Sequence, residues 1–413
     1  MKVLFVHQNF PGQFKHLAPA LAKLGHEVKA LAINNNLIPA GIDAVRYTPS
    51  RSNAPLIHPW LLDMESKVIR GEAAFHAALQ MRENGFQPDI IIAHPGWGES
   101  LFLKDIWPSA RLGLYAEFYY QTKGGDVNFD PEFLTTDVAE NCRLRIKNAG
   151  QDLQFAQADL LISPTYFQAS VFPQYLQDKI SVIHDGIDTQ HLKPDAFAEL
   201  RLNNSLVLNK QSEVITFVNR NLEPMRGYHI FMRSLPEILK QRPNARVVIV
   251  GGDGVSYGAK PPEGNSWKKI FLEEVRDKLD MERVHFVGKV SYPNFIKLLQ
   301  LSSVHVYLTY PFVLSWSLLE AMSMGCAIVA GDTAPVREAI IHNETGRLVD
   351  FFNKQELVAH IIDLLEHPAE RNRLGDAARA FAIQHYDLET VCLPNQLAWV
   401  EKLAQGLGLM TNR

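Results

Sequence analysis

The chain has 413 residues, of which 46% are hydrophobic and 21% are charged, and these values are typical of a soluble globular protein. At this length we expect two domains, because a single hydrophobic core seldom grows beyond about 250–300 residues. The 41 basic and 45 acidic residues give a formal net charge of −4. This charge disfavours a general nucleic-acid binder, since neutralising phosphates requires a basic surplus or a basic stripe.

Cysteine usage and hydropathy indicate a cytoplasmic protein. Cys142, Cys326 and Cys392 are far apart and form no C-x-x-C pair, so neither a disulfide framework nor a zinc site is predicted. The apolar run at the N-terminus is too short for a secretory signal. No run approaches the roughly 20 apolar residues of a membrane helix. Any contact with the inner face of the membrane is therefore expected to be peripheral.

Short apolar runs alternate with helical patterns in the first half of the chain. Strands are predicted at residues 3–6, 27–33, 89–93, 111–117, 158–164 and 180–186, with a helix near residues 14–24. Short apolar runs bounded by Gly, Pro and Asp are typical of strands buried on both faces of a parallel sheet. Their alternation with helices predicts βαβ units.

Residues 189–213 are less apolar and are predicted to form a linker with a helical piece. The alternation then restarts. Strands are predicted at residues 214–220, 245–254, 283–290, 304–310 and 326–332. Amphipathic helices are predicted at residues 227–241 and 266–280, the second with Ser266 as N-cap.

The pattern as a whole predicts an α/β protein with two tandem, doubly wound Rossmann-like domains. We place the N-terminal domain at residues 1–188 and the C-terminal domain at residues 189–385. A C-terminal helix at about residues 386–413 is expected to pack back on the first domain. Ligands of such sheets bind at the carboxyl ends of the strands, so an interdomain cleft between two such edges is the expected site.

Several common sites are absent from the sequence. No G-x-G-x-x-G follows the first strand, and neither G-x-x-x-x-G-K-[ST] nor H-E-x-x-H occurs. This disfavours a dinucleotide dehydrogenase and a P-loop enzyme. No D-x-D pair is present to hold a metal ion, and Pro131 occupies the glycine position of a faint calcium-loop pattern at residues 126–133. We therefore expect no metal ion and no cofactor.

Five segments of the second half occur in a characteristic order. They are FVNRNLEPMRG (217–227), VIVGGDG (248–254), VHFVGKV (284–290), PFVLSWSLLEAMSMG (311–325) and AGDTAPVREAIIHNETGRLVD (330–350). Together they resemble the donor-binding domain of retaining glycosyltransferase family 4 (group 1), which has the two-Rossmann GT-B architecture. NFPGQFKHLA, AHPGWGES and EFYYQTKGGDVNFDPEF in the first half resemble a bacterial glycan-synthesis subgroup of that family.

Two arginines lie between a predicted strand end and a helix start. Arg220 and Arg226 are placed to converge on one diphosphate, which needs cations and helix N-terminal amides. The alternative is two solvated surface arginines. The family normally has lysine at the second position, and arginine keeps the charge while offering a planar fork. Gly252 ends the next strand, where a glycine allows close approach of a ligand. The resemblance implies that main-chain atoms near Val290 contact the nucleobase.

Three residues of the first half are candidates at strand ends. Gly12 follows the first strand, where loop amides can hold a phosphate or sugar, or simply form a βα turn. His94 follows the strand at 89–93, and the resemblance places it against the donor sugar near the reacting carbon. Glu117 ends the next strand and, with the aromatic and acidic loop after it, fits an acceptor sugar or an ordinary solvated loop.

A predicted helix begins inside the segment 311–325. Ser317 and Glu320 match the capping-box spacing S-x-x-E. The resemblance implies that Glu320 also accepts hydrogen bonds from ribose hydroxyls, and that the amides of Ser315, Trp316 and Ser317 face the diphosphate. Most members of the family carry a second glutamate, aimed at the donor sugar, where this chain has Phe312.

The sequence thus predicts a retaining hexosyltransferase acting in polysaccharide biosynthesis. It would move a sugar from a UDP-glucose-like donor to a hydroxyl of a glycan or lipid-linked glycan, with the departing diphosphate stabilised by Arg220 and Arg226. His94 and Glu117 complete the predicted catalytic set. Two alternatives remain open: a nucleotide-sugar epimerase of the same architecture and a non-catalytic nucleotide-sugar binding protein.

Overall fold

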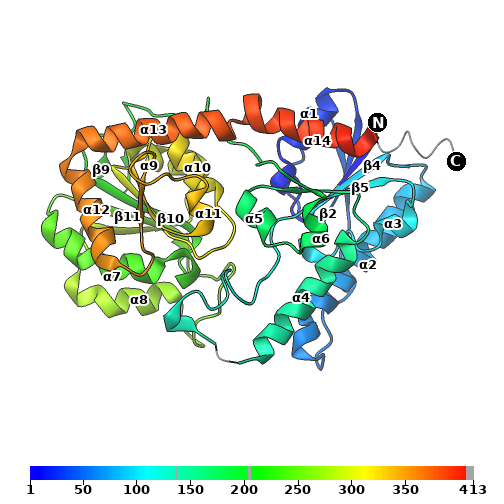
Figure 1. Cartoon of the computed structure of the whole chain (residues 1–413), viewed down its shortest axis with the longest axis horizontal. Helices are drawn as coiled ribbons and strands as arrows, with labels where there is room; N and C mark the ends of the chain where they lie inside the picture. The colour runs from blue at the N-terminus through cyan, green and yellow to red at the C-terminus, as the bar shows by residue number, and fades with distance from the viewer. Residues whose placement is uncertain (136, 203–205, 406–413) are drawn as a thin grey trace. The chain divides into compact units, whose positions relative to one another are not determined.

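The computed structural model describes residues 1–135, 137–202 and 206–405. The chain divides into two compact units. Unit 1 comprises residues 1–186 with 389–413, and unit 2 comprises residues 187–388; the predicted boundaries stood at residues 188 and 385. Each unit is a parallel sheet with helices on both faces (Figure 1).

Unit 1 is built on a sheet whose described part has seven parallel strands in the order β3-β2-β1-β4-β5-β6-β7. The strands are β1 (Lys2–Val6), β2 (Glu27–Ala32), β3 (Ile42–Arg46), β4 (Ile90–Ala93), β5 (Arg111–Tyr115), β6 (Leu160–Ser163) and β7 (Ile180–Val182). The helices are α1 (Leu17–Lys23), α2 (Leu62–Glu83), α3 (Leu103–Ile106), α4 (Ala139–Phe155), α5 (Tyr166–Ser170), α6 (Gln174–Gln177) and α14 (Leu393–Gln405). The strand order reverses between β1 and β4, and ligands of such sheets bind outside the carboxyl ends at this point.

The C-terminal helix α14 packs on the sheet of unit 1. Trp399, Val400 and Leu403 join the apolar cluster formed by β1, β2, β4 and α1. Gly113 in β5 makes this possible, because a Cβ added there would lie 2.5 Å from the Trp399 ring. Residues 406–413 of the predicted helix lie outside the described residues.

Unit 2 has a second parallel sheet, whose described part contains six strands in the order β12-β11-β10-β13-β14-β15. The strands are β10 (Val214–Asn221), β11 (Arg246–Gly252), β12 (Val284–Gly288), β13 (Val304–Tyr307), β14 (Ile328–Gly331) and β15 (Arg347–Val349). The helices are α7 (Tyr228–Gln241), α8 (Trp267–Val275), α9 (Tyr292–Leu301), α10 (Trp316–Ser323), α11 (Ala334–Arg337), α12 (Lys354–Glu366) and α13 (Pro368–Tyr386). Here the order reverses between β10 and β13.

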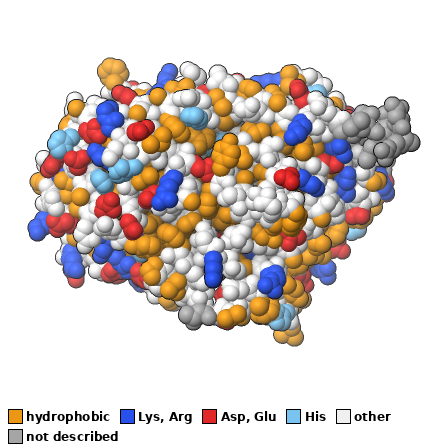
Figure 2. Space-filling model, viewed as in Figure 1, with side chains coloured by type: hydrophobic (Ala, Val, Ile, Leu, Met, Phe, Trp, Pro, Cys, Tyr) orange, Lys and Arg blue, Asp and Glu red, His pale blue; other side chains and the backbone are white. Residues whose placement is uncertain are grey.

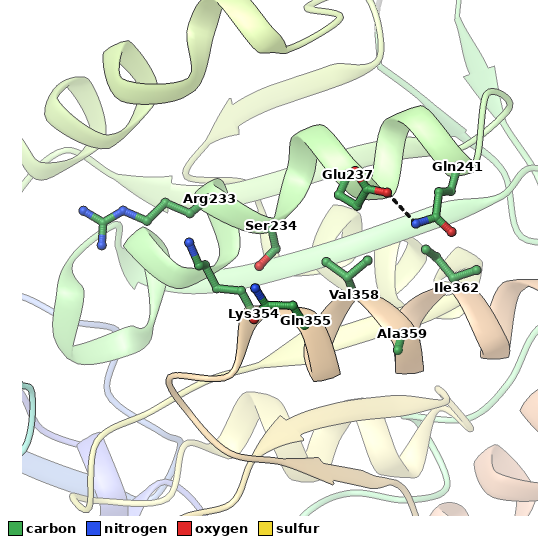
Figure 3. Close-up of a pocket in the computed structure, with 9 residues that line it drawn as sticks. All are labelled: Arg233, Ser234, Glu237, Gln241, Lys354, Gln355, Val358, Ala359 and Ile362. Atoms are coloured by element: carbon green, nitrogen blue, oxygen red, sulfur yellow. Dashed lines mark hydrogen bonds between the residues drawn. The ribbon is translucent and has the colours of Figure 1, made fainter.

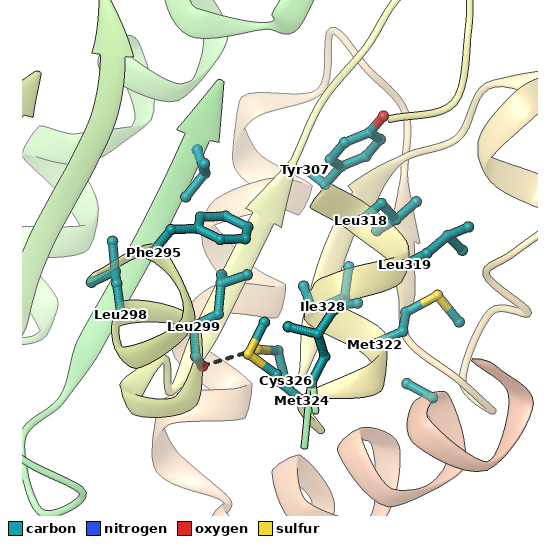
Figure 4. Close-up of a cluster of buried hydrophobic side chains, with 14 of the residues drawn as sticks. Phe295, Leu298, Leu299, Tyr307, Leu318, Leu319, Met322, Met324, Cys326 and Ile328 are labelled. Atoms are coloured by element: carbon teal, nitrogen blue, oxygen red, sulfur yellow. Dashed lines mark hydrogen bonds between the residues drawn. The ribbon is translucent and has the colours of Figure 1, made fainter. Parts of the chain in front are cut away.

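The core of unit 2 lies between this sheet and the helices on its faces. Figure 4 shows α9 and α10 meeting strands β13 and β14, with Leu299 and Leu318 among the buried side chains. The Cys326 thiol is also buried there and donates to the Leu299 carbonyl at 3.1 Å. Two Rossmann-like sheets of this kind confirm the predicted fold class. Ser266 also caps α8 as predicted, by accepting from the Lys269 amide.

The predicted helical piece between residues 189 and 213 is wrong. The described residues there hold a short antiparallel pair, β8 (Leu200–Arg201) and β9 (Val207–Leu208). Leu200, Leu202, Leu206 and Leu208 face the core of unit 2. Their spacing of two residues is the repeat of a strand and not of a helix, and this decides the conformation.

The edge strands β3 and β15 were not predicted from the sequence. Both pair on one side only and carry charged residues, so neither forms the continuous apolar run of a central strand. Acidic and basic side chains are interspersed over the face drawn in Figure 2, as the small net charge leads one to expect. Among the described residues, no helix combines the length and the apolarity needed to cross a membrane.

Candidate functional site

Three predicted residues of unit 1 come together at the carboxyl edge of its sheet. Gly12 opens the 3₁₀ turn η1 (Gly12–Phe14) after β1, His94 follows β4, and Glu117 follows β5. His94 Nε2 lies 3.6 Å from Glu117 Oε2. The Gln13 amide donates to Glu117 Oε1 at 3.2 Å and links the η1 turn to the same carboxylate.

The His94 ring is fixed in orientation and tautomer. Its Nδ1 accepts the Gly96 amide at 3.1 Å, so Nε2 carries the proton and points toward Glu117. The ring stacks on Trp97 and on Tyr115, with centroids 4.6 and 5.4 Å apart, and the residue is only 2% exposed. His94 is therefore a directed N–H donor held by its surroundings.

His7 is a member of this cluster that the sequence reasoning missed. It is the first residue after β1, and its Nδ1 accepts the Asn9 amide while Nε2 donates to Gln13 Oε1 at 2.8 Å. Gly12 packs against this ring, because a Cβ added there would lie 2.5 Å from His7 Nε2. The left-handed φ of +48° at Gly12 adds a second reason for glycine. The predicted contact of Gly12 with a donor stays a prediction.

The electrostatics of the unit 1 cluster favour an ionised Glu117 carboxylate and a neutral His7. Burial alone would raise the pKa of Glu117, but the imidazole of His94, with His7 and Gln13, holds the pKa below its usual value. Burial lowers the pKa of His7 from 6.5 to about 3, and the neighbouring His94 acts in the same direction. At neutral pH the cluster can therefore donate from His94 and accept at Glu117.

The low pKa of His7 makes the stability of the protein depend on pH. The unfolded chain binds a proton at His7 below about pH 6.5 and the folded chain only below about pH 3, so folding weakens as pH falls through this window. We expect the buried His7 to cost about 2 kcal/mol of unfolding free energy at pH 5 relative to pH 7.5. The variant His7→Asn, which retains an acceptor for the Asn9 amide, should lose less stability over this range. Urea unfolding of both proteins at the two pH values measures the difference. Equal losses would show that His7 is not buried in its neutral form.

In unit 2 the two predicted arginines have different environments. Arg226 ends the 3₁₀ turn η5 (Pro224–Arg226) and is buried, and its Nη1 donates to Thr309 Oγ1 at 2.8 Å and to the Val313 carbonyl at 3.4 Å. Arg220 is exposed near the end of β10, and its side chain makes no hydrogen bond or ion pair with the described part of the chain. Arg226 is thus fixed in place by the segment that follows β13, whereas the Arg220 side chain can reorient toward an anion.

Gly252 ends β11, and the side chains of Asn221 and Lys289 pack against it. A Cβ added there would lie 2.7 Å from Asn221 Oδ1 and 2.9 Å from Lys289 Cε. The glycine therefore has a packing reason, and Lys289 is a further cation at this edge that the sequence reasoning did not select. Val290 is half-buried and packs against the core of unit 2, and its proposed main-chain contact with a nucleobase stays a prediction.

The S-x-x-E spacing of Ser317 and Glu320 does not form a capping box, the simpler of the two interpretations of this segment. The N-cap of α10 is Ser315, whose hydroxyl accepts the Ser317 amide at 3.3 Å. The Tyr307 hydroxyl accepts the Ser315 amide and holds this residue in an extended conformation. The helix therefore begins at Trp316, two residues earlier than the pattern requires, and Trp316 packs on the core. Two of the three predicted donor-binding amides are thus hydrogen-bonded within the protein.

The Glu320 side chain is held by a tyrosine. The side chain is largely buried, and its Oε1 accepts from the Tyr292 hydroxyl at 2.7 Å. Tyr292 is the first residue of α9 and is 50% exposed. The carboxylate of Glu320, in the middle of α10, is thus held by the first residue of α9. Tyr292 was missed because nothing in its local sequence distinguishes it.

A loop after β11 is fastened to the same edge by Glu223. This fully buried carboxylate accepts the backbone amides of Ser256, Tyr257 and Gly258. Residues 254–258 also spell G-x-S-x-G, the pattern of a hydrolase nucleophile. The Ser256 hydroxyl accepts from Asn221 at 2.7 Å, and no histidine is bonded to it in the described chain. The loop is therefore a structural element and not a nucleophile elbow.

A separate hollow of about 580 Å³ lies between α7 and α12 (Figure 3). Its lining residues are Arg233, Ser234, Glu237, Gln241, Lys354, Gln355, Val358, Ala359 and Ile362. All of them belong to the two helices, and no strand end contributes. The hollow is thus a groove between helices, separate from the edge that carries Arg226 and Glu320.

Two sequence profiles match most of the chain. The one described as "Glycosyl transferase family 4 group" matches residues 24–192, and the one described as "Glycosyl transferases group 1" matches residues 200–381. The chain is 25% identical over 305 residues to D-inositol 3-phosphate glycosyltransferase of Segniliparus rotundus, covering 70% of this chain and 64% of that protein. It is 22% identical over 419 residues to glycogen synthase of Mycobacterium tuberculosis, covering 95% and 92% of the two chains.

Solved glycosyltransferase structures share the fold along nearly the whole chain. Sucrose-phosphate synthase from Thermosynechococcus elongatus superposes with a TM-score of 0.73 at 18% identity, covering 98% of this chain and 100% of that one. HepE of Anabaena, solved with UDP-glucose, gives a TM-score of 0.66 at 18% identity, covering 97% and 99%. These likenesses confirm the predicted GT-B fold class.

Proposed function

The chain belongs to group 1 of glycosyltransferase family 4, and we propose that it moves a hexosyl group from a UDP-glucose-like donor to a glycan hydroxyl with retention of configuration. The observation that carries the proposal is the arrangement at the carboxyl edge of unit 2. There a buried cation, Arg226, and a positioned carboxylate, Glu320, lie on the elements that follow the switch point of the sheet. A nucleoside diphosphate presents the complementary groups: an anionic diphosphate and a ribose diol.

The proposed donor is a uridine nucleotide. The solved HepE structures contain UDP and UDP-glucose, and they share the fold of this chain. In the proposed complex, Glu320 accepts from the ribose hydroxyls, Arg220 and Arg226 neutralise the diphosphate, and main-chain atoms near Val290 contact the base. The amide of Trp316 and the dipole of α10 add positive potential for the same diphosphate, and Gly252 permits close approach.

The proposed transfer uses no covalent intermediate. The bond between C1 of the sugar and the phosphate oxygen breaks, and the acceptor oxygen bonds to C1 from the same face. The acceptor proton passes to the departing phosphate oxygen, and the cations stabilise the charge that develops on the diphosphate. His94 donates from Nε2 to a sugar hydroxyl, and the ionised Glu117 accepts from a hydroxyl of the acceptor. We assign no step to a metal ion.

The test is binding and turnover with a panel of nucleotides. We expect the melting temperature to rise with UDP and UDP-sugars and not with NAD or ATP, in the presence and absence of EDTA. With a glycan acceptor, NMR of the product should show the anomeric configuration of the donor. Formation of an epimer without acceptor would indicate an epimerase. Binding without turnover on any acceptor would indicate a binding protein, and stabilisation by NAD or ATP alone would refute the proposal.

A further inference from the structure

Two aromatic rings meet at the carboxyl edge of unit 2 above the buried arginine. The centroids of Tyr257 and Phe312 lie 5.0 Å apart. The guanidinium carbon of Arg226 lies 5.5 Å from the centre of the Tyr257 ring and 5.9 Å from that of Phe312. Both rings are within the range of a cation–π contact, so the three side chains form one cluster.

The two rings differ in what they present to solvent. Phe312 is 3% exposed and is part of the interior, whereas Tyr257 is 45% exposed. The Tyr257 hydroxyl makes no hydrogen bond to the described residues. A large exposed aromatic side chain on a loop normally moves between rotamers. The Tyr257 ring, however, packs against the buried Phe312 ring.

The loop that carries Tyr257 is fixed by the buried carboxylate of Glu223. It accepts three consecutive amides, from Ser256, Tyr257 and Gly258, at 3.1–3.4 Å. A second bond joins Asn221 Nδ2 to the Ser256 hydroxyl at 2.7 Å. Glu223 is fully buried, so its carboxylate depends on these amides for hydrogen bonds. If the loop moved away, the carboxylate would remain buried without hydrogen-bond partners, which costs free energy.

We propose that the exposed ring of Tyr257, backed by the buried ring of Phe312, is an aromatic platform that contacts the sugar of the donor. Glu223 is the positioning residue that holds the backbone of Tyr257 in place. The inference rests on the proposed function and adds the side chain that recognises the transferred group. The platform lies beside Arg226, where the diphosphate is proposed to bind, so it faces the group attached to that diphosphate. Aromatic rings are the usual partners of the C–H faces of sugars.

The chemistry of the platform selects a neutral pyranosyl group. The ring and the single hydroxyl of Tyr257 offer little to replace the water around a carboxylate, whereas the C–H face of an uncharged pyranose loses no hydrogen bond on contact. Arg226 does not compensate a carboxylate, because Nη1 is engaged by Thr309 and Val313 and the cation is assigned to the diphosphate. A donor such as UDP-glucose is therefore favoured over the corresponding uronic acid.

The test compares a nucleotide sugar with its free nucleotide. Dissociation constants for UDP, UDP-glucose and UDP-glucuronic acid are measured by calorimetry on the full-length protein and on Tyr257→Ala, Tyr257→Phe and Glu223→Gln. We expect Tyr257→Ala to weaken UDP-glucose about fivefold to tenfold and to change UDP less than twofold. Tyr257→Phe should bind as the native protein does, and Glu223→Gln should reproduce the selective loss. Phe197→Ala, at an exposed aromatic residue of the same unit, is the matched control and should change neither value.

The outcomes separate the two proposals. If the native protein binds none of the nucleotides, the proposed function fails and the inference fails with it. If it binds UDP-glucose but Tyr257→Ala leaves the affinity unchanged, or weakens UDP equally, the inference alone is overturned. A preference of the native protein for UDP-glucuronic acid would also overturn it. A purely structural role of Glu223 would lower the melting temperature without changing the ratio of the UDP-glucose and UDP affinities.

Discussion

Replacing Arg226 with alanine is expected to lower kcat/KM for the donor by about a thousandfold. The guanidinium is buried, hydrogen-bonded to Thr309 and Val313, and so fixed before the donor arrives. A charge of this kind stabilises the departing diphosphate without reorganisation. Initial-rate kinetics with varied donor measure the loss, and most of it should appear in kcat because charge accumulates on the diphosphate in the transition state.

Two further variants distinguish charge from folding. Arg226→Lys keeps the positive charge but cannot reproduce the guanidinium geometry, and we expect it to recover part of the activity. Arg276→Ala removes an exposed arginine that pairs with Glu273 on α8 and should leave the kinetics unchanged. Urea unfolding shows whether each variant is folded under assay conditions. If folded Arg226→Ala retains native kcat/KM, the cation does not act on the donor.

Replacing Glu320 with glutamine is expected to weaken UDP binding by roughly tenfold to a hundredfold, the cost of losing a charged hydrogen-bond acceptor. Because Ser315 and not Ser317 caps α10, the effect cannot be attributed to a lost capping box. Tyr292→Phe should weaken UDP binding only a few-fold, since it frees the carboxylate without removing it. Calorimetric titration of UDP into each variant gives the affinities.

The double variant and a control complete this test. If Tyr292 acts through Glu320, Tyr292→Phe should have no additional effect on UDP affinity in the Glu320→Gln protein. Glu237→Gln, at an exposed carboxylate on α7, is the control and should bind UDP normally. A Glu320→Gln protein with a lower melting temperature but native UDP affinity would assign Glu320 to folding alone.

The strand ends that carry the candidate site were predictable from the sequence because buried parallel strands are short, apolar and sharply bounded. His94 and Glu117 were selected for that reason, and the structure brings their side chains to 3.6 Å of each other. The carboxyl ends of neighbouring parallel strands share one edge of a sheet, so order along the chain is enough to group them. The edge strands β3 and β15 escaped this reasoning because they are buried on fewer sides.

The partners of the site residues could not be predicted in the same way. Tyr292 and Glu320 are 28 residues apart, Glu223 and Tyr257 are 34 apart, and Arg226 and Thr309 are 83 apart. Side-chain contacts at such separations depend on how elements pack, which no local pattern encodes. The same holds for the start of α10. The Ser315 amide donates to the Tyr307 hydroxyl, and Ser315 is therefore the N-cap in place of Ser317, which the S-x-x-E spacing indicated.

The sequence by itself thus determined the family, the two wound sheets and the strand ends at which the candidate residues lie. This was possible because the spacing and the limits of the apolar runs reflect directly which residues are buried. Only the tertiary structure decided that Glu320 is held by Tyr292 and that a phenylalanine replaces the family's second glutamate as half of an aromatic pair with Tyr257. Those arrangements follow from packing between segments distant in the chain, where the free energy of a contact depends on both partners and not on the local sequence of either.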